Sequence, residues 1–151
     1  MLIQSKHLGL IEIDEEKIIT FQEGIIGFSD IHRYILLGEE EGNPFQWLQA
    51  VDEPNLTFVV VPSKVICPTY KPKLNQDVLE NLKIGDLEKV LFYSIVVLPE
   101  DISQMRTNLQ SPLVINLENN KAKQVVLNQP EYKVRHYILQ EMGEAKNVSA
   151  D

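Results

Sequence analysis

The sequence predicts a mainly β protein, a single-domain antiparallel β-barrel-like fold with one or two short helices. Most apolar segments are short and rich in β-branched or aromatic residues, which is typical of strands. Glycine, proline, asparagine and acidic residues separate these segments at short intervals, as in meanders and barrels. The length of 151 residues, with 44% hydrophobic and 24% charged residues, fits one domain with one core.

The N-terminal third contains three predicted strands. Leu10–Ile13 and Ile18–Phe21 are apolar and flank the acidic segment Asp14–Lys17, so we expect them to form a first hairpin. Tyr34–Leu37 follows as the third strand. The carboxylates of Glu39–Glu41 cannot pack in a core, and we expect a solvated hairpin tip there.

A second hairpin is the clearest local prediction. Phe45–Val51 alternates in part between apolar and polar residues, and Thr57–Val61 is a β-branched run. Asp52–Asn55 contains the residue types that form tight turns. The three segments together predict two antiparallel strands and their turn.

The apolar period changes to a helical one after residue 74. Asn75 is a suitable N-cap, apolar residues then recur at helical spacing, and Gly85 offers a stop, which predicts a short helix over about Asn75–Ile84. The nearly continuous apolar run Val90–Leu98 predicts a strand that is buried on both faces, ended by Pro99.

The last third predicts a third hairpin and a final strand. Leu113–Leu117 and Lys123–Leu127 are joined by Glu118–Ala122, whose asparagines tolerate a left-handed backbone. Tyr132–Ile138 alternates well enough for the last strand.

The domain is expected to span residues 1–142. Residues 143–151 have too little apolar content to pack, so we expect a flexible tail there.

Charge and composition favour a cytoplasmic protein that binds other proteins. The net charge of −8 and pI of about 4.9 repel phosphate backbones and anionic lipids, so direct nucleic-acid and membrane binding are not expected. The same field favours a cationic protein partner, but on charge alone solubility is the first explanation of an acidic surface. A single cysteine, together with the lack of a signal sequence or an apolar run of membrane-spanning length, agrees with a cytoplasmic location.

No catalytic, metal or cofactor pattern stands out in the sequence. Cys67 has no histidine close in sequence and is expected to be a small buried residue. The histidines lack metal-ligand spacing, and Gly24–Gly27 does not open a helix as a phosphate loop would. The adjacent carboxylates are solvated rather than tuned for acid–base chemistry. We therefore predict neither an enzyme nor a bound cofactor or metal.

Two function classes remain open from the residues alone. The first is a protein-binding module, which the charge and the missing catalytic groups favour. The second is a small-molecule-binding barrel of the flavin type, which would need phosphate contacts that the sequence does not offer. The aromatic residues Phe45, Trp47 and Phe58 are expected in the core, the alternative being anchors for a partner.

Several ordered motifs resemble the family of the bacterial flagellar assembly factor FliW. The resemblance covers roughly residues 1 to 138, and the motifs keep the family's order and separation. They are Gly9-x-Ile11-x-Ile13, the run from Ile19 to Phe28, Phe45–Pro54, Phe58–Val61, Asn108–Asn116 and Lys123–Leu127.

The resemblance implies a non-enzymatic regulator with a β-barrel-like fold and two alternative protein partners. One partner is flagellin, bound through its C-terminal region. The other is the carbon storage regulator CsrA, a small basic dimer that represses flagellin translation. Family members antagonise CsrA noncompetitively, away from its RNA groove, and accumulating flagellin draws them off again.

The resemblance also suggests where partners make contact. We expect contacts at the turn that begins with Asp52 and holds Asn55, at Phe58 and Pro62, and in the loop from Asn108 to Pro112. Each of these residues also has a structural explanation in a turn, a strand end or the core.

Other residues are assigned different roles. Glu39, Glu40 and Glu41 are expected to steer a basic partner electrostatically. Gly24, Gly27 and Phe28 are interpreted as scaffold, two glycines for a turn and one aromatic for the core. Trp47 is interpreted as a local packing choice.

Overall fold

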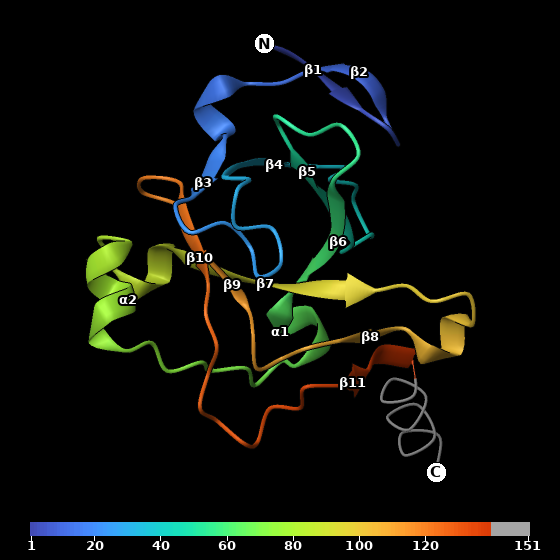
Figure 1. Cartoon of the computed structure of the whole chain (residues 1–151). Helices are drawn as coiled ribbons and strands as arrows, with labels where there is room; N and C mark the ends of the chain where they lie inside the picture. Colours follow the sequence, from blue (N-terminus) through green and yellow to red (C-terminus); the bar gives the residue numbers. More distant parts are fainter. Residues whose placement is uncertain (140–151) are drawn as a thin grey trace.

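The computed structural model describes residues 1–139, and their regular secondary structure is mainly β-strand (Figure 1). The predicted tail of residues 143–151 lies outside the described residues. In order, the strands are β1 (Leu2–Ser5), β2 (Gly9–Glu12), β3 (Ile19–Phe21), β4 (Arg33–Leu37), β5 (Gln46–Ala50), β6 (Thr57–Pro62), β7 (Val90–Val97), β8 (Arg106–Thr107), β9 (Leu113–Asn116), β10 (Lys121–Gln124) and β11 (His136–Tyr137). The α-helices are α1 (Ser63–Ile66) and α2 (Gln76–Asn81), and 3₁₀ turns occupy Glu15–Lys17, Leu87–Lys89 and Ile102–Gln104.

Seven strands of the described chain close into a barrel, in the order β7-β6-β5-β4-β3-β10-β9 with β9 pairing back onto β7. The predicted mainly β, barrel-like fold is confirmed. One junction differs from an all-antiparallel barrel, because β3 and β10 run parallel, with Lys121 opposite Thr20. These two strands are about a hundred residues apart in the chain, so no hairpin turn dictates their direction. β8 pairs with the C-terminal end of β7, beyond the residues that pair with β9, and β11 pairs with β8.

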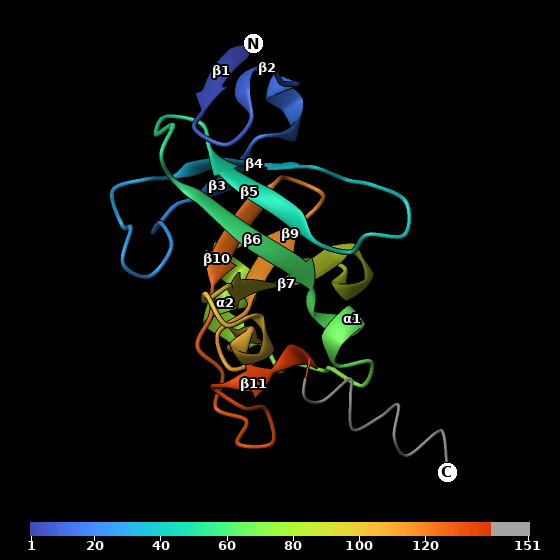
Figure 2. The same cartoon turned by 90° about the vertical axis from the view of Figure 1, so that its right-hand side faces the viewer.

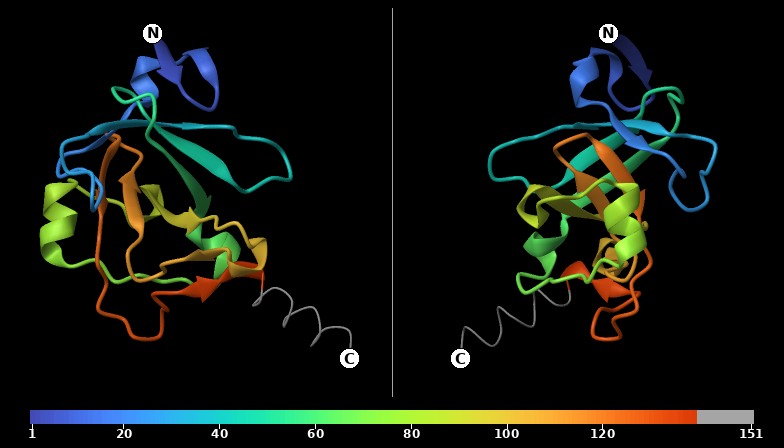
Figure 3. Two further views of the ribbon diagram at one scale, coloured as in Figure 1. Left: turned by 45° about the vertical axis from the view of Figure 1, so that its right-hand side comes forward. Right: turned by 90° about the vertical axis from the view of Figure 1, so that its left-hand side faces the viewer.

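Side chains fill the interior of the barrel. Alternate residues of neighbouring strands point inward, among them Phe21, Tyr34, Leu48 and Val60, each 0% exposed. Tyr34 packs edge-on against Phe21, with ring centroids 5.3 Å apart. A second apolar cluster, around Tyr70, lies between the barrel and α2, which Figure 3 shows beside β10. The barrel is therefore a packed core rather than an open container.

The predicted first hairpin is wrong. β2 pairs with β1, with Ile3 opposite Ile11, in a separate two-stranded sheet at one end of the molecule (Figure 2). The acidic segment does not make a hairpin turn, because the Asp14 carboxylate accepts a hydrogen bond from the Glu16 backbone N–H at 3.0 Å and starts a 3₁₀ turn. That turn sends the chain onward into β3.

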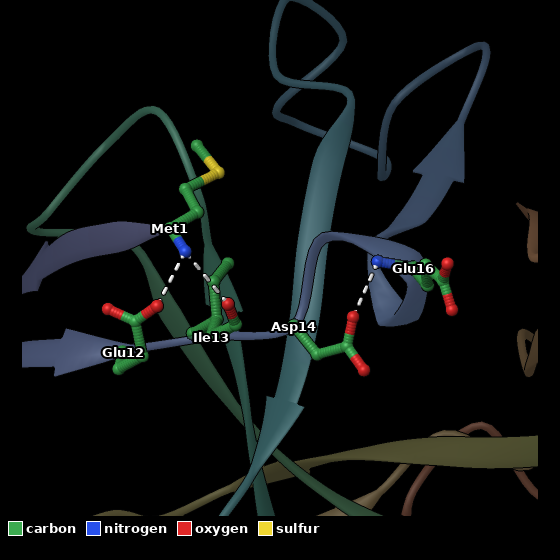
Figure 4. A network of polar contacts seen from close by, with 5 residues as sticks. All are labelled: Met1, Glu12, Ile13, Asp14 and Glu16. Carbon is green, nitrogen blue, oxygen red and sulfur yellow. Dashed lines mark hydrogen bonds and ion pairs between the residues drawn. The ribbon is translucent and has the colours of Figure 1, made fainter.

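The first residue fixes the end of the β1–β2 hairpin. The α-ammonium of Met1 donates to Oε1 of Glu12 at 2.7 Å and to the Ile13 carbonyl at 3.2 Å (Figure 4). The Ile13 N–H donates in return to the Met1 carbonyl. One face of the hairpin covers Ile35 and Val51 of the barrel wall. The hairpin is thus held on the outside of the barrel.

The second hairpin is confirmed in position and register. β5 and β6 are antiparallel, with Gln46 opposite Val60 and Gln49 opposite Thr57. The strand predicted over Tyr34–Leu37 is β4, which pairs with β5. Glu39–Glu41 lie in the exposed connection between β4 and β5, so the predicted solvated tip is confirmed.

The predicted helix is confirmed as α2, but its stop is not at Gly85. The Asn75 side chain accepts a hydrogen bond from the Val78 N–H at 3.0 Å, as an N-cap does. The chain leaves the helix at Lys83, which has a left-handed φ of 52°. The short helix α1, directly after β6, has too few residues to show an apolar period, so no pattern in the sequence predicts it.

The later strands are shorter than predicted or start at different residues. The run Val90–Leu98 is confirmed as β7, which ends one residue earlier. The third hairpin is confirmed as β9 and β10, but β10 begins at Lys121 because Asn120 takes the left-handed backbone, with a φ of 56°. Of the predicted last strand only His136–Tyr137 pairs, with β8.

Candidate functional site

The turn between β5 and β6 holds the first predicted contact residues, and hydrogen bonds of the Gln49 side chain fix its conformation. Gln49 is 0% exposed. Its Oε1 accepts hydrogen bonds from the hydroxyls of Ser5 (2.8 Å) and Thr57 (2.5 Å). Its Nε2 donates to the carbonyls of Ala50 (3.0 Å) and Leu56 (3.2 Å), with longer contacts to two further carbonyls of the turn. Every polar atom of this buried amide is satisfied, so the turn has one fixed shape.

Asp52 begins the turn and pairs with Arg33. The guanidinium donates twice to the carboxylate, from Nε at 2.9 Å and from Nη2 at 2.5 Å. This pairing lowers the pKa of the Asp52 carboxyl and raises the pKa of Arg33. Both side chains are about half exposed, so the pair orients the turn more than it stabilises the fold. Asn55, the other predicted contact in the turn, is exposed.

Phe58 joins the turn to the core. It is half-buried and packs edge-on against Phe28, with ring centroids 5.4 Å apart, and against Tyr34 at 6.1 Å. Phe28 is 40% exposed, so this aromatic pair reaches the surface. Gly24 makes the loop before Phe28 possible, because it has a φ of 71° and an added Cβ would lie 2.6 Å from the Phe28 carbonyl oxygen.

The remaining predicted contacts lie at the far end of β6. Pro62 is the last residue of β6, and Asn108 and Pro112 belong to the loop that leads into β9. The Asn108 Oδ1 accepts from the Gln110 N–H at 2.9 Å, which closes that loop, and Pro112 is buried. Pro62 and Leu113 flank Tyr93 of β7 from either side.

The structure thus divides the predicted contact residues into two groups. Thr57 and Pro62, at the two ends of β6, are five residues apart, which is roughly 16 Å along a strand. Asp52, Asn55 and Phe58 lie at the β1–β2 end, and the loop of Asn108 lies at the other.

The acidic tip stands beside the mouth of the barrel. Glu39 lines a hollow of about 290 Å³ there, together with Lys17, Gln46 and Tyr93. Tyr93 donates its hydroxyl hydrogen to Oε1 of Gln46 at 3.0 Å, and burial together with the charge of Glu39 raises the pKa of Tyr93. Glu40 and Glu41 are exposed on the same connection.

The net charge of the chain is confined to its first part. Residues 1–55 contain eleven Asp and Glu against three Lys and Arg, which gives −8, and residues 56–151 contain eleven of each kind. Figure 1 shows the first part, coloured blue to teal, gathered around the β1–β2 end of the molecule. We call this part of the molecule the acidic end; within it, the turn of Asp52 and the tip of Glu39–Glu41 lie at opposite ends of β5.

The structure offers little for catalysis. Within residues 1–139, no group of three or more His, Cys, Asp or Glu side chains is arranged to hold a metal ion. Cys67 is half-buried against the Tyr70 cluster, and its Sγ lies 3.9 Å from Oγ1 of Thr69. None of the helices in the described part is long and apolar enough to pass through a membrane.

Comparisons with known proteins identify the family. The FliW protein family model matches residues 2–138. The flagellar assembly factor FliW of Ruminiclostridium cellulolyticum is 45% identical over 143 residues, covering 94% of this chain and 97% of that protein. The FliW of Thermoanaerobacter pseudethanolicus is 40% identical over 146 residues, covering 96% and 97%.

The chain belongs to the FliW family. A crystal structure of a flagellar assembly factor FliW superposes with a TM-score of 0.83 at 36% identity, covering 91% of this chain and 96% of that one. The resemblance seen in the sequence motifs is confirmed. Membership in a family of assembly factors also confirms that this FliW-family chain is not an enzyme.

Gln49 is the structural residue that sequence reasoning missed, and Trp47, which it named, lies two residues before it on β5. Both lie on the outward face of β5, where they alternate with the inward-facing Leu48 and Ala50, and the β1–β2 hairpin contacts both. Trp47 stacks on His7 with ring centroids 5.6 Å apart, and it lies outside the core in which it was expected. The signal was a polar residue alternating with apolar ones in a strand, but the partner that covers it is about 40 residues earlier.

Proposed function

We propose that this protein is a cytoplasmic flagellar assembly factor that binds two protein partners in turn, flagellin and the translational repressor CsrA. Bound to CsrA away from its RNA groove, the protein relieves repression of flagellin translation. Newly made flagellin, through its C-terminal region, then draws the protein off CsrA and restores repression. This cycle requires binding alone, without a cofactor, nucleic acid or membrane.

The observation that carries this proposal is family membership over residues 2–138, since the curated relatives are named as flagellar assembly factors. The charge distribution supports the choice of a basic partner. An acidic end attracts a cationic protein from a distance and raises its association rate. Additional negative potential close to an RNA-binding surface also weakens RNA binding without covering it.

We place the partner contacts on the two groups of predicted residues. Asp52, Asn55 and Phe58 form the first group, on a turn that Gln49 holds in one shape, so little conformational entropy is lost when a partner binds. Pro62 and the loop from Asn108 to Pro112 form the second, roughly 16 Å further along β6. Two partners can exclude each other in two ways. They can overlap on the same contact group, or binding at one contact group can lower the affinity at the other.

The test is a calorimetric titration of the purified protein with flagellin and, separately, with CsrA. Saturable binding to both, with the CsrA signal suppressed by prior addition of flagellin, is the expected result. Absence of binding to either partner would overturn the proposal.

A matched pair of variants tests the first contact group. Asn55→Ala should weaken binding of at least one partner, whereas Asn128→Ala, at an exposed asparagine elsewhere, should leave both affinities unchanged. Equal affinities for the two variants would remove the β5–β6 turn from the interface. RNA-binding assays with CsrA then show whether the protein acts without competing for the RNA groove.

A further inference from the structure

A small apolar groove opens on the outside of the barrel, beneath the acidic tip. It has a volume of about 250 Å³, and its apolar lining comes from Leu8 of the β1–β2 turn, Phe45, Trp47 of β5 and Val59 of β6. Gly38 and Glu40 line it from the β4–β5 connection. This Trp47 groove is distinct from the β5–β6 turn and from the loop of Asn108, which are the predicted contact groups.

Two close neighbours hold the tryptophan ring of the groove in place. The His7 ring stacks on Trp47 at an interplanar angle of 15°. The Gly38 backbone also lies against the ring, where an added Cβ would sit 2.8 Å from Cδ1 of Trp47. The ring therefore presents one fixed surface, and a partner that packs on it does not have to order it first.

Glu40 lines the groove, and Glu39 and Glu41 are its neighbours in the chain. Glu39, Glu40 and Glu41 are all exposed, and none of them forms an ion pair with another side chain of residues 1–139. They belong to the acidic end of the molecule, which holds the whole net charge of −8. Free carboxylates beside an apolar hollow suit a ligand that is both cationic and apolar.

We propose that the Trp47 groove binds a cationic segment of a protein partner, which inserts one large apolar side chain between Leu8, Trp47 and Val59. Lysine or arginine residues next to that side chain pair with Glu39–Glu41. The volume fits a leucine or methionine side chain and is below the usual range for drug-sized ligands, roughly 300 Å³ and more. A second copy of this chain is disfavoured as the occupant, because two acidic ends repel each other.

The groove contains its own reporter, since Trp47 is the only tryptophan of the chain. The full-length protein is titrated with the synthetic peptide Lys-Arg-Leu-Lys-Arg while tryptophan emission is followed. We expect a saturable change that weakens as salt is raised. The peptide Lys-Arg-Ala-Lys-Arg should bind about tenfold more weakly, because it lacks the apolar anchor. An unchanged emission with the first peptide, or equal affinity for both, would overturn the proposal.

Two pairs of variants separate the apolar from the charged contribution. Leu8→Ala should weaken peptide binding, whereas Leu10→Ala, on the exposed face of the same hairpin, should not. Replacing Glu39, Glu40 and Glu41 by glutamine should weaken binding roughly fivefold or more. The same change at Glu88, Glu100 and Glu118 alters the net charge equally at exposed sites outside the acidic end and should have little effect. Equal effects within either pair would contradict the proposed surface.

The inference rests on the proposed function only for its choice of a protein occupant, and the two fail in different ways. If CsrA or flagellin binds and the Leu8→Ala variant binds it equally well, the partner-binding function stands and the groove is excluded. If neither protein binds but the leucine peptide does, the proposed function fails and the groove stands.

Discussion

Gln49 offers the sharpest test of how the candidate site is built. In Gln49→Leu the side chain keeps its approximate size, so little cavity forms, but the amide is lost. The hydroxyls of Ser5 and Thr57 then lose their common acceptor in a region that is buried or half-buried. Each buried polar group left without a partner costs about 1–3 kcal/mol, so two of them lower the free energy of unfolding by about 3 kcal/mol.

Urea unfolding and a thermal melt measure this loss. For a domain of this size, 1 kcal/mol corresponds to a shift of about 2–4 °C, so the melting temperature should fall by about 6–12 °C. The control is Gln4→Leu, at an exposed position on the outer face of β1, where the expected loss is below about 0.5 kcal/mol.

Hydrogen exchange locates the effect. The Ala50 N–H donates to the Leu56 carbonyl at 3.0 Å across the turn, and its protection should fall further than that of β9 amides in the variant. A loss of less than about 1 kcal/mol, no larger than in the control, would refute the view that Gln49 is the polar centre of the turn.

Three further substitutions test local features. Gly38→Ala, at a φ of 79° and against the Trp47 ring, should cost about 1–3 kcal/mol and shift the tryptophan emission, whereas Gly42→Ala, at a φ of 81° in open space, should cost stability without shifting it. Asn75→Ala removes the N-cap of α2 and should lower the free energy of unfolding by about 1 kcal/mol in urea. The Arg33 guanidinium lowers the pKa of Asp52 below its ordinary value of 3.8 in the folded protein. The ion pair therefore stabilises the fold above pH 3.8, and this stabilisation is lost as the pH falls through the lowered pKa. Asp52→Asn should therefore cost less than about 1 kcal/mol near neutral pH and nothing in strong acid, as measured by urea unfolding at both.

Elements defined by neighbouring residues could be predicted from the sequence. The β5–β6 hairpin follows from alternation on both sides of a turn-forming tetrapeptide, and α2 follows from its asparagine cap. The acidic tip follows from three adjacent carboxylates that cannot be buried. In each of these elements the contacts that decide the conformation are local, so a few residues contain the whole signal.

Elements defined by distant partners could not be predicted in the same way. In the sequence, β2 lies between two apolar segments, β1 and β3, and either could be its pairing partner. β2 pairs with β1 because the Asp14-capped turn directs the chain away and Phe21 of β3 is buried inside the barrel. The parallel pairing of β3 with β10 joins segments about a hundred residues apart. Pairings of this kind are decided by the closure of the whole barrel rather than by any turn.

The candidate site also combines features set by neighbouring residues with features set by distant ones. The sequence located the β5–β6 turn, but it did not show that Gln49 and Trp47, two residues apart on the outward face of β5, both depend on the β1–β2 hairpin. Ser5 bonds to Gln49, and His7 stacks on Trp47. Since one hairpin secures both the turn and the Trp47 groove, a partner that displaces it at one surface must also change the other. For the two proposed partners, this arrangement is a physical route by which binding of one alters binding of the other.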